Sequence, residues 1–597
     1  MKMIINNGLK RAISVSFAVF LIAVATVASE AMTEKLISNG RIALKREPQP
    51  IENNNQKDHK TIRITYPTGS REGTSGAKTV MEISGNWAKI TTVSHRRDTD
   101  APVQATYLDY NTGREIKTAL LKGEESIYTI RSFTINEGLE FLDETEVIAG
   151  YKCKKAKTII NSNTLEIWYT TELGMYGSVQ PGVAIPEGIV LKVVRNGNPT
   201  AVASKVELLN EETVLEPTLR GVELKAPAFN YKIQQSRVIA VNVFDHESIY
   251  FRDIPKVTQL DEEKVLRFAN GSILMRKVKL PEENMGYSIF TELSHYSEGD
   301  AYDRTGSIFI IPTERERSFF DGLLHGKESL PVYHDKDGNP YEGMVVTDDY
   351  LPPFELMRFY TSFGVRGYNH IEVADYNWPD SVVFKQEVTD YASILKGDVW
   401  VGAWIGNYSH DGHNVTLDIK YYPQRESAPK EVYPLFATVN IMEMAGQAYP
   451  ENIFRNDSLT VNFKIDRDLK DGYIRYISTG HGGWGGGDEF NPKLNEIFLD
   501  GKRIIAYTPW REDCGSYREL NPASGNFANG LSSSDLSRSG WCPGTVSYPV
   551  YIRVGDMKAG EHQLKVTIPV GDPAGNSLSY WCISGVLVGD VDGNPAD

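Results

Sequence analysis

The chain has 597 residues, and at roughly 100–200 residues per domain we expect three or more domains. Its formal net charge is −15 at pH 7 and its pI is about 5.4. Such an acidic protein is a poor partner for nucleic acid or for an anionic membrane surface, so we exclude both.

The N-terminus has the pattern of an export signal. An apolar run, Ala12–Val27, follows basic residues and precedes small ones, which are Lys2, Lys10 and Arg11 before it and Ala28, Ser29 and Ala31 after it. A membrane anchor is the alternative, but the run is shorter than the ~20 apolar residues of a span. We therefore predict a signal peptide over residues 1–31, no transmembrane segment after its removal, and a protein that is secreted or exposed in the periplasm or at the cell surface.

Three segments of the N-terminal region carry a resemblance, and they are Gly150-Tyr-Lys-Cys-Lys-Lys155, Ile167-Trp-Tyr-Thr170 and Ile185-Pro-Glu-Gly-Ile-Val190. Together they resemble the extracytoplasmic GLPGLI family of Bacteroidetes, although the hexapeptide that names the family is only loosely matched. The resemblance implies a β-rich accessory domain and no chemistry.

The rest of the chain is also β-rich. Apolar and polar residues alternate in Val415–Tyr421, Leu459–Ile465 and Leu564–Ile568, as in half-buried strands. Asp500-Gly501 predicts a tight hairpin between Ile497–Leu499 and Ile504–Tyr507. Long helical periodicities are scarce, so we predict an all-β protein built of sandwiches or jelly rolls.

Two turn-rich segments, near Pro227–Gln235 and near Pro423–Pro434, are candidate boundaries. They give an N-terminal domain over Met32–Gln235 and two later domains over Ser236–Pro423 and Gln424–Asp597.

No motif calls for a metal or another cofactor. His370, His410, His413 and His481 do not have the spacing of a zinc site. Asp335-Lys-Asp-Gly-Asn339 has some likeness to a calcium loop, but it lacks the final glutamate, and an Asp-Gly turn is the simpler interpretation. We predict no cofactor.

Four separated patches carry a second resemblance, and they are Asp300-Ala-Tyr-Asp-Arg304; Glu355-Leu-Met-Arg-Phe359 with Thr361-Ser-Phe363; Thr479-Gly-His-Gly482 with Gly487-Asp-Glu-Phe490; and Asp513-Cys514 with Tyr517-Arg518 and Arg538-Ser-Gly-Trp-Cys-Pro-Gly544. Their order and spacing resemble the peptide:N-glycosidase F family over about 350 residues. The resemblance implies two adjacent jelly-roll domains with an active site in the cleft between them.

The same resemblance implies the catalytic residues. Asp303 matches the central catalytic aspartate, Glu489 the glutamate near the reactive water, and Arg304 and Arg538 the arginines of the site. Taken alone, each has an ordinary explanation: Asp303 and Arg304 form a surface ion pair, Glu489 belongs to a flexible glycine-rich loop, or Arg538 pairs with Asp535.

Aromatic residues are the expected sugar platform, because their rings stack on the apolar faces of pyranoses. Trp404 matches a tryptophan of the family's site, and Tyr302 replaces an aromatic residue before the catalytic aspartate. We assign substrate binding also to Trp484, in the glycine-rich loop, and to His481. Trp541 is expected in the core instead.

One departure from the family falls on Gly402, where the family has an acid two residues before the stacking tryptophan. A glycine there removes a charge and is expected to open space for a decorated glycan core, such as one with fucose on the 3-position of the first GlcNAc.

The four cysteines, Cys153, Cys514, Cys542 and Cys582, allow three pairings. No two form a CxxC, and Cys153 and Cys582 also read as buried free thiols in strands. The resemblance implies a Cys514–Cys542 disulfide, while the family's other bridges are absent.

The leading hypothesis is an amidase that hydrolyses the GlcNAc–asparagine bond of N-linked glycans on glycoproteins or glycopeptides, acting as a monomer. The alternatives are a non-catalytic glycan- or glycoprotein-binding protein on the same scaffold and an adhesion or assembly protein.

Overall fold

The computed structural model describes residues 60–67, 78–93, 102–121, 125–133, 138–368, 370, 374–424, 430–439, 453–456, 458–482, 487–525, 530–570 and 579–591. The expected signal peptide and Trp484 lie outside these residues. The chain divides into two compact units, one ending at Phe229 and the other running from Asn230 to Asp597, apart from a short exchange at residues 100–102. None of the helices in the described part combines the length and apolarity needed to cross a membrane.

The first unit is a sandwich of two sheets. The larger sheet contains, in spatial order, β12 (Lys205–Leu209), β1 (Thr61–Pro67), β2 (Lys78–Ser84), β3 (Trp87–Val93), β4 (Val103–Asp109), β5 (Arg114–Leu120), β6 (Ser126–Ser132) and β13 (Val222–Glu223). The smaller one contains β11 (Asn198–Val202), β10 (Ile189–Arg195), β9 (Asn163–Thr170), β8 (Tyr151–Ile160) and β7 (Glu140–Ile148). Alternate residues of the two sheets form one apolar core that includes Cys153.

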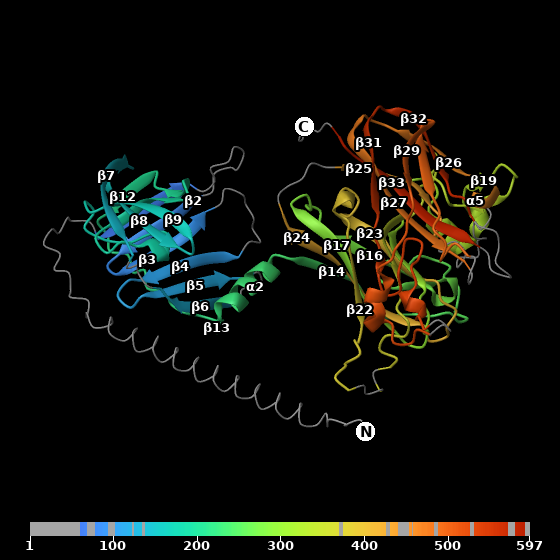
Figure 1. Ribbon diagram of the computed structural model, residues 1–597, viewed down its shortest axis with the longest axis horizontal. Coiled ribbons are helices and arrows are strands. Elements are labelled where there is room, and N and C mark those ends of the chain that lie inside the picture. The colour runs from blue at the N-terminus through green and yellow to red at the C-terminus, as the bar shows by residue number, and fades with distance from the viewer. Residues whose placement is uncertain are drawn as a thin grey trace, which may run out of the picture. The chain divides into compact units, whose positions relative to one another are not determined.

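Helix α2 (Ala226–Ser236) follows the first unit's strands (Figure 1). It occupies the segment that the sequence predicts to be a turn-rich boundary. Pro227 lies in the first turn of this helix, where its missing N–H costs no intrahelical hydrogen bond. A proline that punctuates the sequence therefore begins a helix here rather than a loop.

The second unit begins with a sandwich over its first half. One sheet contains β14 (Ile239–Ile249), β24 (His413–Pro423), β17 (Tyr287–Ser297) and β22 (Val382–Glu387). The other contains β15 (Leu266–Phe268), β16 (Ile273–Leu280), β23 (Gly397–Ile405), β18 (Thr305–Ile310), β21 (Phe354–Tyr360) and β30 (Val546–Ser547). The chain crosses repeatedly between the two sheets, as in a jelly roll, and the pairings within them are antiparallel.

A further sandwich follows in the same unit (Figure 1). Its sheets contain β25 (Lys430–Ala437), β33 (Tyr580–Asp590), β27 (Leu469–His481) and β31 (Val550–Met557), and β26 (Leu459–Ile465), β32 (Gly560–Thr567), β28 (Asn495–Leu499) and β29 (Lys502–Tyr507). The predicted strands Val415–Tyr421 and Leu459–Ile465 are confirmed as β24 and β26. The predicted hairpin joins β28 to β29, and Asp500 and Gly501 both have positive φ. The all-β prediction is therefore confirmed.

The remaining elements are short. They are α3 (Phe319–His325), α5 (Ile453–Asn456), the hairpin β19 (Val332–His334) and β20 (Pro340–Glu342), and the 3-10 turns η1 (Pro181–Val183), η2 (Ala269–Gly271), η3 (Lys327–Ser329), η4 (Thr389–Tyr391), η5 (Cys514–Leu520) and η6 (Ser533–Asp535). The loop of the β19–β20 hairpin is the predicted Asp-Gly turn, in which Asp335 accepts hydrogen bonds from Asp337, Asn339 and Tyr341.

The two sandwiches of the second unit are joined by main chain and by buried charge. Strand β30 comes from the later part of the chain but pairs with β21 of the earlier sandwich. On β21, Arg358 forms a buried ion pair with Glu355 and donates to the Cys582 carbonyl of β33 at 2.6 Å. Removing one partner of a buried pair leaves an uncompensated charge, so this contact fixes how the sandwiches face one another.

Candidate active site

Asp303 lies just before β18, in a segment held on both sides by one threonine. Thr361, which follows β21, donates its hydroxyl to the Tyr302 carbonyl at 2.8 Å and accepts the Arg304 N–H at 2.7 Å. The Arg304 carbonyl in turn accepts the Thr361 N–H. This clamp sets the position of Asp303 at the edge of the earlier of the two sandwiches in the second unit.

Glu489 comes from the later sandwich of the second unit, in the segment between β27 and β28. The Ser539 N–H donates to the Glu489 carbonyl at 2.9 Å, and the Ser539 carbonyl accepts the N–H of Gly480 in β27. Arg538 precedes Ser539, and its main chain exchanges two hydrogen bonds with Arg511. Glu489 and Arg538 are therefore neighbours although 49 residues separate them in the chain.

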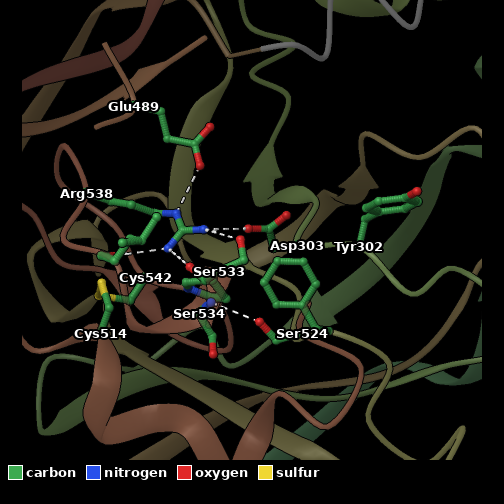
Figure 2. A network of polar contacts seen from close by, with 12 residues as sticks. Tyr302, Asp303, Glu489, Cys514, Ser524, Ser533, Ser534, Arg538 and Cys542 are labelled. Atoms are coloured by element: carbon green, nitrogen blue, oxygen red, sulfur yellow. Dashed lines mark hydrogen bonds and ion pairs between the residues drawn. A yellow bond between two sulfur atoms is a disulfide. The ribbon is translucent and has the colours of Figure 1, made fainter. Parts of the chain in front are cut away.

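The Arg538 guanidinium joins the two carboxylates. Its Nε lies 3.0 Å from Glu489 and its Nη2 lies 3.3 Å from Asp303. Figure 2 draws both contacts as dashed lines. The arginine side chain is only 1% exposed, while those of Asp303 and Glu489 are 18% and 21% exposed. Two largely buried carboxylates, each about one-fifth exposed, thus converge on a fully buried cation.

Arg538 is braced from behind. Its Nη1 donates to the carbonyls of Ser533 and Leu536, and its guanidinium lies 5.1 Å from the Phe490 ring centroid and 4.8 Å from that of Trp541. The alternative that Arg538 pairs with Asp535 is wrong, because Arg518 pairs with Asp535 instead.

The charges of the site shift one another's pKa values. Burial raises the pKa of Asp303 to about 7; Arg538 opposes this shift and the negative charge of Glu489 adds to it. Burial also raises the pKa of Glu489, again against the effect of Arg538. A carboxyl of this kind holds a proton near neutral pH, which is what general acid–base chemistry requires.

Arg304 does not touch the two-carboxylate cluster. Its Nε donates to Asp300 at 2.8 Å, and Asp300 also accepts the Tyr302 N–H at 3.0 Å. The His413 ring, whose Nε2 lies 3.7 Å from the Asp300 carboxylate, and the hydrogen bond from Arg304 outweigh burial and hold the pKa of Asp300 at about 2. Asp300 is therefore a permanent anion that fixes both neighbours of Asp303. The sequence shows it only as an aspartate four residues before Arg304.

Trp404 does not form a sugar platform in this structure. It is fully buried on β23, which lies between β16 and β18, and a Cβ added at Gly406 would lie only 2.8 Å from its ring. The resemblance matched Trp404 to a tryptophan of the family's site, but a sequence motif could not show that other side chains cover the ring.

Gly402 does not open a pocket. A Cβ placed there would lie 2.3 Å from the Phe309 ring and 2.7 Å from the Met275 sulfur, so the space of a missing side chain is already filled. His481 is also not a substrate contact: it is buried, and its Nε2 lies 3.0 Å from the hydroxyls of both Tyr360 and Thr479. Of the predicted platform, Tyr302 is exposed.

The remaining side chains agree with simpler expectations. Cys514 and Cys542 form the disulfide, whereas Cys153 and Cys582 are buried and not disulfide-bonded. Trp541 is buried and stacks on Tyr360 at a centroid distance of 4.0 Å. Within the described residues no three histidine, cysteine or acidic side chains are grouped to hold a metal ion.

Family models match three stretches of the chain. Residues 240–421 match peptide-N-glycosidase F, N terminal, and residues 448–588 match peptide-N-glycosidase F, C terminal. Residues 64–232 match the N-glycanase peptide, N-terminal domain. Among curated protein sequences, none matches the chain.

The chain is also similar to solved structures of proteins named PNGF-II and PNGase F. One crystal form of PNGF-II is 42% identical, with a TM-score of 0.72, and the match covers 89% of this chain and 99% of that one. A second crystal form is 40% identical, with a TM-score of 0.67, over 90% and 99%. PNGase F, a glycosylasparaginase from Flavobacterium meningosepticum, is 13% identical, with a TM-score of 0.40, over 60% and 96%.

Proposed function

The chain belongs to the peptide:N-glycosidase F family, and on that premise we propose that it hydrolyses the amide bond between asparagine and the first GlcNAc of an N-linked glycan. The observation that carries this proposal is the convergence of Asp303 and Glu489, one from each sandwich, on the buried Arg538 guanidinium.

The site supplies what amide hydrolysis needs. Water adds to the amide carbon, and the positive charge of the Arg538 guanidinium, which lies behind the two carboxylates, stabilises the oxyanion that develops. The leaving nitrogen requires a proton, and the raised pKa of Asp303 keeps one available near neutral pH. Glu489 orients the water and accepts its proton. The C–N bond then breaks, giving a glycosylamine and an aspartate.

The proposal is tested with a denatured N-glycoprotein. The wild type should increase the protein's gel mobility, and mass spectrometry should find aspartate at each former glycosylated asparagine. Asp303→Asn should fold normally and leave the glycan in place. Conversion by Asp303→Asn at the wild-type rate would refute the assigned role.

A non-catalytic glycan-binding protein is the second candidate, favoured by the exposed aromatic side chain of Tyr302. It would retain glycoprotein on a column without changing its mass. The two carboxylates argue for the enzyme, because sugar binding alone has no need of two acids around one cation.

Tolerance of a core fucose on the 3-position of the first GlcNAc is a prediction separate from the amidase activity. It has no support from Gly402, whose surroundings are filled. Plant-type glycopeptides, with and without that fucose, decide it directly through the ratio of their cleavage rates.

A further inference from the structure

Two large aromatic side chains near Arg304, the residue after Asp303, are open to solvent. Tyr302 is 61% exposed and Tyr408 is 58% exposed. The Arg304 guanidinium lies 4.8 Å from the Tyr302 ring centroid and 5.9 Å from that of Tyr408. The Tyr408 ring meets Phe251 edge-on at 5.4 Å. We call these four side chains the outer strip.

The outer strip is fixed before any ligand arrives. Asp300 is buried, and its two carboxylate oxygens hold the Tyr302 main chain and the Arg304 side chain. The main chain of Phe251 is tied to the loop of Tyr408, because its N–H donates to the Ser409 carbonyl at 2.9 Å. A preformed platform loses little side-chain freedom on binding.

The strip is continuous with the reaction site. Tyr302 and Arg304 flank Asp303, and consecutive Cα atoms are only about 3.8 Å apart. Figure 2 shows Tyr302 on the other side of Asp303 from Arg538. A ligand whose reacting bond lies at Asp303 and Arg538 can therefore extend over the strip.

The chemistry of the strip fits sugar rings. Exposed tyrosine faces stack on the C–H faces of pyranoses, and a guanidinium donates to hydroxyl groups. Arg304 donates its Nε–H to Asp300, and its Nη groups have no hydrogen-bond partner among the described residues, so they can reach a ligand.

An extended peptide fits the strip less well. The main-chain groups along it are already used, namely the Tyr302 N–H and carbonyl, the Arg304 N–H and carbonyl, and the Phe251 N–H. Peptides recognised by strand addition need such groups to be open.

We propose that the outer strip binds sugars of the N-glycan beyond its first two residues, so that this enzyme prefers long glycans to a two-sugar stub. The inference rests on the proposed function for its substrate, and it extends the site along the first sandwich.

The test uses one peptide that carries either a two-sugar stub or an intact branched glycan. Tyr408→Ala should lower kcat/KM for the intact glycan about five- to tenfold and lower it much less for the stub, as expected when one stacking contact is lost. Tyr408→Trp, which keeps a large aromatic ring at this position, should keep the wild-type preference for the intact glycan. The matched control is Tyr551→Ala. Tyr551 is a similarly exposed tyrosine on β31, and its ring contacts Tyr473 on the neighbouring strand β27. This control should change neither value.

The failures are distinguishable. If the wild type cleaves neither substrate, the proposed function fails. If the wild type cleaves both substrates and Tyr408→Ala lowers the two kcat/KM values equally or not at all, the proposal for the outer strip is wrong. A second, longer peptide that carries the same two glycans completes the test: if the loss caused by Tyr408→Ala changes with peptide length at constant glycan, the strip binds peptide and the inference is wrong. Titration of Asp303→Asn with free oligosaccharides, with and without Tyr408→Ala, measures the same contact without turnover.

Discussion

Replacing Arg538 with methionine tests the charge arrangement of the site. Methionine keeps much of the side-chain length but removes the guanidinium that lies 3.0 Å from Glu489 and 3.3 Å from Asp303. Above their pKa values the two carboxylates are then buried without a cation. Such a loss costs about 3–5 kcal/mol of unfolding free energy.

The cost should depend on pH in a defined direction. Arg538 lowers the pKa of both carboxyls, so its removal raises both. A carboxyl whose pKa is raised in the folded state contributes stability below its unfolded pKa and loses it as pH rises through the folded pKa. Near pH 5 Asp303 is protonated in both proteins, and the variant chiefly leaves the Ser533 and Leu536 carbonyls without a donor, at about 1–3 kcal/mol each at most. Above neutral pH the full charge cost is added.

Urea unfolding followed by tryptophan fluorescence at several pH values measures this difference. Arg511→Met is the control, because Arg511 pairs with the more exposed Asp513 and keeps the pKa of that carboxyl low. The control's stability loss should be constant above about pH 5, where an ordinary aspartate is already ionised. A loss for Arg538→Met that is equal at acidic and alkaline pH would refute the assignment of charge to Asp303 and Glu489.

Three further predictions concern stability. The pKa of Asp303 is about 7 in the folded state, so wild-type stability should fall by up to about 4 kcal/mol as pH rises from about 4 to 7, and Asp303→Asn should flatten that slope in urea titrations. Replacing Cys514 and Cys542 with serine opens a loop with a sequence separation of 28 and should cost about 3–4 kcal/mol, measured by unfolding with and without reductant. Gly402→Ala should cost about 1–3 kcal/mol by overpacking, whereas Gly286→Ala, which meets no atom within 4 Å, should leave the melting temperature almost unchanged.

The sequence predicted the secondary structure where local patterns are strong. Alternation fixed Leu459–Ile465 because one face of that strand is buried, and Asp500-Gly501 fixed its hairpin because few residue pairs adopt two consecutive positive φ values. The pattern failed at Pro227, because a proline is compatible with both a turn and the first turn of a helix.

Burial is what the sequence could not give. Trp404 and His481 both lie in motifs that resemble a binding site, yet both are covered by residues from distant segments. Gly402 suggested an open pocket, but Phe309 and Met275 from neighbouring strands fill the space. Exposure depends on what packs from elsewhere in the chain, and a local motif contains no record of it.

The sequence by itself determined an acidic, β-rich chain whose motifs include Asp303, Glu489 and Arg538. Only the tertiary structure decided that Arg538 holds both carboxylates and that Asp300 fixes the residues around Asp303. It also decided that the rings of Tyr302 and Tyr408 both lie close to the Arg304 guanidinium. The physical reason is the long sequence separation of these contacts, 235 residues between Asp303 and Arg538, because the packing of whole sheets brings such groups within hydrogen-bond distance.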